Sequence, residues 1–160
     1  MHTITIHNLG NADCTLIQLD QGRTILFDYA DTRDRTDQYC LRSDLPVALR
    51  DALGDDGYID VVAFSHLDRD HITGSTNFFY FDHAAKYQGD VDGEKRIKID
   101  VMWVPAAVIT ETLGKDALEE AKAIQTEARE RFKAGKGVRV FSRPERLKDW
   151  CRENGVDIVS

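Results

Sequence analysis

Two histidines and two aspartates lie within six residues of one another, in the segment HLDRDH at positions 66–71. In an extended chain the side chains at positions 66, 68 and 70 point to one side, and a turn after Asp70 brings His71 to the same side. Carboxylates placed this close repel each other, and a divalent cation converts that repulsion into ligation. The spacing therefore predicts that His66, Asp68, Asp70 and His71 are metal ligands.

The surroundings of this segment favour the same interpretation. It directly follows the apolar run IDVVAF at 59–64, which predicts a short strand buried on both faces. Ligand-binding and catalytic groups collect beyond the carboxyl ends of such strands. The alternative is a solvated polar loop in which the histidines cap a helix. The strand before the segment and the small-residue helix start at 72–74 favour the metal site.

The first half of the chain reads as β-rich. Residues 3–7, 14–19 and 24–27 have the composition of strands, and the turn at 20–22 predicts that the last two form a hairpin. The polar stretch 31–44 has no periodicity and predicts a surface segment. Ser43 or Asp44 is expected to cap a short helix, with Pro46 in its first turn, that ends at Gly54 or Gly57.

The second half reads as α/β. We expect an aromatic cluster at 78–81 that is core or a buried interface, a loop at 88–95 and a strand at 97–104. An apolar period of three to four residues predicts a long amphipathic helix at 112–133, and a strand follows at 138–141. Ser142 and Glu145 form a capping box for a helix ending at Gly155, and residues 156–159 predict the start of a further strand.

Composition sets the broad class. A chain of 160 residues that is 42% apolar and 31% charged fits a single globular domain. No apolar run approaches the roughly 18 residues of a membrane span, and residues 1–10 lack the pattern of a secretory signal. We therefore expect no membrane contact and a cytoplasmic location. Cys14, Cys40 and Cys151 have no paired spacing, which predicts free thiols rather than disulfides or a cysteine-bound zinc.

The net charge of −7 falls entirely on the first half of the chain. Residues 1–75 carry 13 aspartates against six arginines, and the acids and bases of residues 76–160 balance. A protein that binds nucleic acid by electrostatics alone has a basic excess, which this chain lacks. A phosphodiester substrate would therefore require bound cations near the first half. The alternative is an acidic surface that only keeps the protein soluble.

The stretch HLDRDHITG at 66–74 resembles the first metal motif of the metallo-β-lactamase superfamily, HxHxDH, in the variant HxDxDH that is typical of its ComEC-like group. Residues 9–17 (LGNADCTLI), followed by residues 24–28, are similar to the opening strands of that group. Ala12 stands where the group has a glycine, and Tyr29 and Ala30 stand where it has paired glycines. The resemblance covers residues 3–75 and extends over the rest only in outline.

The resemblance implies a role for each matching residue. His66 and Asp68 would bind a first metal ion, and Asp70 and His71 a second, with Asp70 also orienting a bridging hydroxide. Asp28 would brace the metal loop from behind, or it is only a turn residue. The resemblance places one further carboxylate, that of Asp13, in the opening loop without a defined role.

The resemblance also implies the chemistry. Two divalent cations would activate water, and a carboxylate in place of the second histidine favours Mn²⁺ or Mg²⁺ over an all-histidine zinc site, with Zn²⁺ still possible. The expected function is a dinuclear phosphodiesterase or nuclease acting on DNA or RNA. Arg69 would contact a substrate phosphate or form a surface salt bridge. The alternatives are a thioester, lactone or β-lactam hydrolase of the same fold, and a non-catalytic regulatory module with a partial metal site.

Several ligands of the family have no counterpart here. Outside the motif the histidines are His2, His7 and His83, and none matches a later ligand position. The resemblance therefore implies that residues 1–160 are the amino-terminal half of a single αββα domain, and the expected partner is the carboxy-terminal half. That half would be a separate or cleaved chain, or the site would be completed in an oligomer, or the chain is a shortened one. Likeness to defence proteins of this superfamily suggests activation by a protease in antiviral defence.

Overall fold

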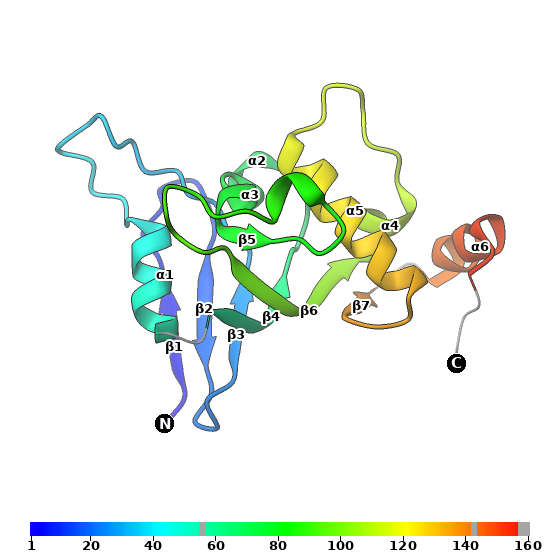
Figure 1. Cartoon of the computed structure of the whole chain (residues 1–160), viewed down its shortest axis with the longest axis horizontal. Coiled ribbons are helices and arrows are strands. Elements are labelled where there is room, and N and C mark those ends of the chain that lie inside the picture. The colour runs from blue at the N-terminus through cyan, green and yellow to red at the C-terminus, as the bar shows by residue number, and fades with distance from the viewer. Residues whose placement is uncertain (55–56, 142–143, 157–160) are drawn as a thin grey trace.

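A computed structural model describes residues 1–54, 57–141 and 144–156, and its strands form one mixed sheet (Figure 1). The strand order is β1-β2-β3-β4-β6-β5, and β7 also pairs with β6. The first three strands are antiparallel, and β3, β4, β6, β5 and β7 are joined by parallel pairings. The strands are β1 (Thr3–Ile6), β2 (Thr15–Gln18), β3 (Thr24–Phe27), β4 (Tyr58–Ala63), β5 (Phe79–Tyr80), β6 (Ile97–Pro105) and β7 (Val138–Phe141).

Helices connect these strands, and the α/β class expected from the sequence is confirmed. Within the described parts of the chain, none of the helices is both long and apolar enough to cross a lipid bilayer. The helices are α1 (Leu45–Leu53), α2 (Arg69–Ile72), α3 (Ser75–Phe78), the 3₁₀ turn η2 (Ala85–Tyr87), α4 (Ala106–Thr110), α5 (Glu119–Lys133) and α6 (Pro144–Asn154).

The inner face of the sheet carries the hydrophobic core. The strand register aligns Leu16, Leu26, Val62 and Met102 in one row, and each is at most 1% exposed. Helices α1, α2, α3 and α5 contribute side chains to the same core. Three residues of the aromatic cluster at 78–81, Phe78, Phe79 and Phe81, belong to it as well, which confirms the prediction that they are core, whereas Tyr80 is partly buried. These rings and two further buried rings of the core stack with or lie edge-on to one another. The full set is Tyr29, Phe64, Phe78, Phe79 and Phe81.

The outer face of the same sheet is apolar and only partly covered, with its most exposed side chains on β1 and β3. The register aligns a row of five aliphatic residues across it, and a second row lies nearer the carboxyl ends of β3 and β4. In these rows Ile4 is 65% exposed, Ile6 79% and Phe27 39%. Parallel strands are normally covered on both faces. The first row is Ile4, Ile17, Ile25, Val61 and Val101, and the second includes Ile6, Phe27, Ala63 and Trp103.

The prediction of a long helix at 112–133 is wrong at its start. Helix α5 begins at Glu119, and residues 111–118 form a loop after the short helix α4. The helical spacing of Leu113 was misleading because this side chain packs against the core from the loop, as Leu118 does. The capping residue Ser142 and residues 157–159 of the predicted last strand lie outside the described residues.

Gly74 joins α2 to α3 in a left-handed conformation, with φ of 77°. A Cβ atom there would lie 3.4 Å from the Cβ of Asp31. We expect Gly74→Ala to lower the free energy of unfolding by about 1–2 kcal/mol, because a side chain is strained in this conformation. Urea denaturation followed by circular dichroism measures the change. Gly114→Ala is the matched control, since Gly114 is not in that conformation, and equal stability of the two variants would contradict the prediction.

Candidate metal centre

The segment 66–71 and Asp28 meet because β3 and β4 are parallel neighbours. Strand β3 ends at Phe27 and β4 at Ala63, which are paired in the register, so the residues that follow each strand emerge at the same edge. The Asp28 N–H donates to the Ala63 carbonyl at 2.8 Å. Parallel pairing thus places a carboxylate from one strand end beside the polar segment that follows the other.

Three of the four predicted ligands converge. The chain is extended at Asp68 and turns into α2 at Arg69, and this turn brings Asp70 and His71 back towards His66. One ligand atom from each of His66, Asp70 and His71 lies within 4.8 Å of the other two. Ligand bonds of about 2.0–2.2 Å in a tetrahedral site place ligand atoms about 3.5 Å apart, so side-chain movements of about 1 Å would close this set on a cation. The donor set of two imidazoles and a carboxylate suits Zn²⁺ or Mn²⁺.

Asp68, the fourth predicted ligand, lies outside this three-residue cluster. Its Oδ2 is 3.6 Å from His66 Nε2, and its side chain is 79% exposed. The structure therefore brings Asp68 to His66 but not to Asp70 or His71. Ligation of a first metal ion by His66 and Asp68 stays a prediction.

Asp28 is a buried partner of His71. Its side chain is 8% exposed, and its Oδ2 lies 2.8 Å from His71 Nδ1. A carboxylate at Nδ1 fixes the tautomer of the ring and leaves Nε2 free to ligate, which is the usual arrangement behind metal-binding histidines. Asp28 itself has a positive φ of 54°, a conformation uncommon for a residue other than glycine.

Ser65 completes this network, and the sequence interpretation gave it no role. Its N–H and hydroxyl donate to the two carboxylate oxygens of Asp28 at 2.7 and 2.6 Å. The same hydroxyl oxygen lies 2.9 Å from His66 Nδ1 and 3.4 Å from His71 Nδ1. Ser65 therefore couples both histidines to Asp28. The available signal was a small hydroxyl residue between the buried strand and the first histidine.

Asp13 reaches the same centre from the loop before β2. Its Oδ2 lies 3.7 Å from His71 Nε2, and the Oδ2 of Asp70 lies 3.5 Å from that same nitrogen. The Asp13 N–H donates to the Asp70 carbonyl at 3.1 Å, which ties the two segments together. Two carboxylates thus lie near the ring nitrogen that Asp28 leaves free, and Asp13 borders the cluster of His66, Asp70 and His71 without belonging to it.

His83 and the three cysteines, which are also of metal-binding types, do not belong to this cluster. His83 Nδ1 lies 3.2 Å from the buried Glu127 carboxylate and belongs to a separate network. All three cysteines are free, as expected. Burial, and secondarily the charge of Asp28, raises the pKa of the Cys14 thiol well above its usual range. Without a bound ion, Cys14 therefore remains protonated at neutral pH and is not an activated nucleophile.

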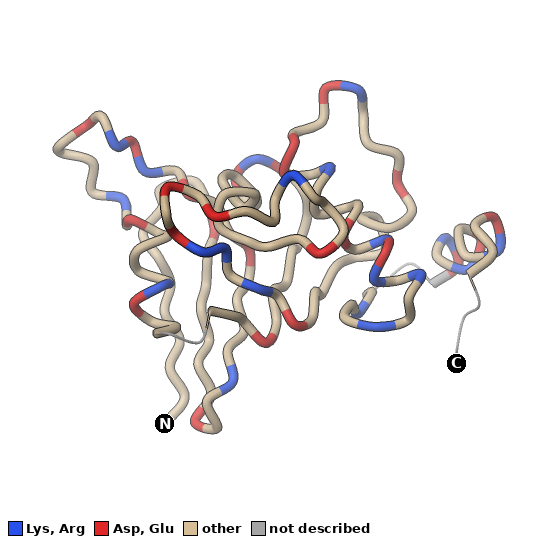
Figure 2. Tube along the Cα trace, viewed as in Figure 1, with Lys and Arg blue, Asp and Glu red and all other residues tan. Residues whose placement is uncertain are grey.

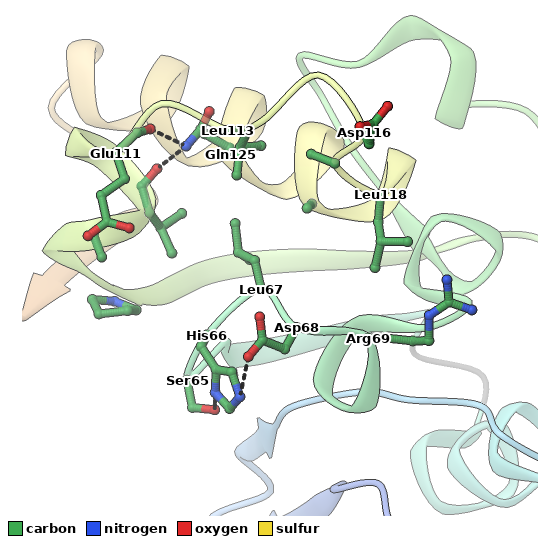
Figure 3. A pocket seen from close by; sticks show the side chains of 15 residues that line it. Ser65, His66, Leu67, Asp68, Arg69, Glu111, Leu113, Asp116, Leu118 and Gln125 are labelled. Carbon is green, nitrogen blue, oxygen red and sulfur yellow. Dashed lines mark hydrogen bonds and ion pairs between the residues drawn. The ribbon is translucent and has the colours of Figure 1, made fainter.

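A cavity of about 590 Å³ adjoins the centre. Its lower wall is the segment 65–69, and its upper wall is α4, the loop 111–118 and the start of α5 (Figure 3). His66 and Asp68 line it, so the cavity opens onto one flank of the candidate metal site. Along the Cα trace of the described residues, lysine and arginine positions are scattered among aspartate and glutamate positions (Figure 2).

A scan against protein-family models finds no match to this chain, and searches of curated proteins and of solved structures find no significant match.

Proposed function

We propose that this chain is the metal-binding part of a metal-dependent hydrolase. The observation that carries the proposal is the convergence of His66, Asp70 and His71 within 4.8 Å, with His71 held by the buried Asp28 carboxylate. Two imidazoles and a carboxylate are a common ligand set for a divalent cation, and a carboxylate at Nδ1 is the usual arrangement behind a metal-binding histidine. A divalent cation bound there supplies a water molecule that ionises near neutral pH.

The protein residues around that ion have distinct tasks. Asp28 and Ser65 hold the two imidazole rings in place, and His66, Asp70 and His71 bind the ion. Asp13 and Asp70 present the carboxylates nearest His71 Nε2, so either can accept a proton from a water molecule at the centre. The second cation predicted from the sequence would require Asp68 and ligands from elsewhere.

The partly covered outer face of the sheet supports the predicted αββα sandwich. Two rows of apolar side chains, including Ile4, Ile6 and Phe27, would be covered by a second sheet packed against them. The row with Ile6 and Phe27 runs beside the strand ends that carry the metal centre. A second sheet on this face would therefore bring its own loops to the site and could supply the remaining ligands. The predicted partner, a carboxy-terminal half in a separate or cleaved chain, would fill this role.

The sequence resemblance makes a phosphodiester of DNA or RNA the first candidate substrate. Bound cations would offset the excess of aspartate in residues 1–75 and contact the phosphate. A second candidate is a carboxylic ester, thioester or lactone. The aliphatic cavity that His66 shares with the metal centre favours this second class. Proteolytic activation in antiviral defence belongs to the first candidate alone.

Metal binding tests the proposal. Isothermal titration with Zn²⁺ and with Mn²⁺ should show binding to the native chain and at least tenfold weaker binding to His66→Ala/Asp70→Ala, because two ligands are lost. The double variant His2→Ala/Asp20→Ala removes an exposed His–Asp pair of the same residue types and should bind like the native chain. Equal metal affinity in all three proteins would contradict the metal centre.

Hydrolysis separates the candidates. The metal-loaded chain is incubated with plasmid DNA, single-stranded RNA and a p-nitrophenyl ester, each with and without a chelator. Chelator-sensitive cleavage that is lost in His66→Ala/Asp70→Ala identifies the substrate class. Tight metal binding with no cleavage of any of them would favour the non-catalytic module over the hydrolase.

A further inference from the structure

The cavity beside the metal centre has walls that metal ligation does not explain. Leu67 projects from the segment 65–69, and Leu113 and Leu118 approach it from the opposite wall (Figure 3). All three are only partly buried, although they are large apolar side chains. They therefore leave an apolar surface open to a ligand at the flank of His66.

Smaller apolar side chains extend this surface. Ala107, Val108, Ala117 and Ala121 contribute to it, and among the described lining residues there is no Phe, Tyr or Trp. Gln125, a polar residue of the back wall, already donates to the carbonyls of Val108 and Glu111 at 2.9 and 3.0 Å. The walls thus offer burial of apolar surface, without a large aromatic side chain on which a nucleobase could stack and without an unused amide donor at Gln125.

The charged side chains of the cavity lining also offer little to an anionic ligand. Glu111 is paired, with Arg146 3.9 Å away. The other carboxylates of the lining are those of Asp68 and Asp116, and Arg69 is the one lysine or arginine among the described lining residues. A phosphate or carboxylate group inside the cavity would gain no net attraction from these charges, whereas an uncharged aliphatic group needs none.

We infer that this cavity binds the aliphatic acyl or alkyl chain of a substrate and leaves its ester, thioester or lactone group beside His66. The inference rests on the proposed hydrolase for the bond that is cleaved, and it decides between the two candidate substrate classes. Binding of the chain itself requires only the cavity, so it is measurable on the protein without metal.

The test compares 1-octanol with 1-butanol, two uncharged probes that differ by four methylene groups, by ligand-observed NMR on the chelator-treated chain. Full burial of each methylene is worth about fourfold in affinity, so partial burial of four should make 1-octanol bind at least ~10-fold more tightly. Equal affinities for the two alcohols would overturn the inference.

Two variants locate the binding. Ala107→Phe fills the cavity from α4, and Leu113→Ser removes apolar surface from the loop, and each should weaken 1-octanol binding at least fivefold. Ala134→Phe places the same ring on an exposed alanine at the far end of α5 and should bind like the native chain. Unchanged 1-octanol affinity in both cavity variants would place the alcohol elsewhere and contradict the inference.

Metal titration of the same proteins keeps the two proposals distinct. Ala107→Phe should retain the metal affinity of the native chain, because Ala107 is not in the metal cluster. Binding of 1-octanol without binding of Zn²⁺ or Mn²⁺ would support the cavity and refute the hydrolase. Binding of metal without binding of 1-octanol would refute the cavity and leave the hydrolase standing.

Discussion

Asp28→Asn should lower the affinity of the chain for Zn²⁺ or Mn²⁺ by about 10–100-fold, the usual effect of losing the carboxylate behind a metal-binding histidine. The Asp28 carboxylate accepts from both donors of Ser65 and lies 2.8 Å from His71 Nδ1. An amide has one acceptor oxygen and one donor nitrogen, so it cannot keep all three interactions. The His71 ring would lose its fixed tautomer and orientation, and Nε2 would no longer be presented to the ion.

Isothermal titration measures this loss, and Asp60→Asn is its matched control. Asp60 also bridges β3 and β4, because its Oδ2 accepts from the N–H and hydroxyl of Thr24 at 2.7 and 3.1 Å. It lies on β4 rather than at the strand end that carries the candidate metal centre, so Asp60→Asn should change metal affinity less than threefold. If both variants bind metal like the native chain, Asp28 is only a turn residue and does not hold the His71 ring in place for metal binding.

The parts of this centre that the sequence predicted are local ones. The convergence of His66, Asp70 and His71 depends on six consecutive residues and one turn, which residue spacing can indicate. The contact between His71 and Asp28 spans 43 residues and depends on the parallel pairing of β3 with β4, which only the family resemblance suggested. No local pattern brings the loop before β2 to α2, so the approach of Asp13 to His71 required the structure.

Helix α5 shows a second limit of sequence patterns. Periodicity treats its charged residues as a solvated face, yet Glu127 is 0% exposed and Arg131 6%. Glu127 pairs with Arg131 and accepts from the His83 N–H, and Arg131 also donates to main-chain carbonyls of β6 and of Gly137. Such partners are invisible in a hydrophobic pattern. The same limit applies to the loop 111–118, whose apolar side chains were assigned to a helix.

Arg131→Met should destabilise the protein by about 3–5 kcal/mol, the range expected when one partner of a buried ion pair is removed. Arg131 Nε donates to Glu127 Oε1 at 2.7 Å, and the guanidinium also donates to three main-chain carbonyls. Methionine has similar length but no donor, so the Glu127 charge loses its nearest cation and retains the His83 N–H at 2.7 Å. The three carbonyls left without this donor belong to Ile99, Asp100 and Gly137.

Lys133→Met on the same helix is the control, because Lys133 pairs with Glu130 at 2.8 Å in an exposed position. Exposed pairs of this kind contribute about 0.2–1 kcal/mol, so urea denaturation should separate the two variants by at least ~2 kcal/mol. The double variant Glu127→Leu/Arg131→Met should recover much of the lost free energy of unfolding, since it removes the buried carboxylate along with its partner. If Arg131→Met is no less stable than Lys133→Met, the buried network contributes no more than a surface pair, and packing alone holds α5 on the sheet.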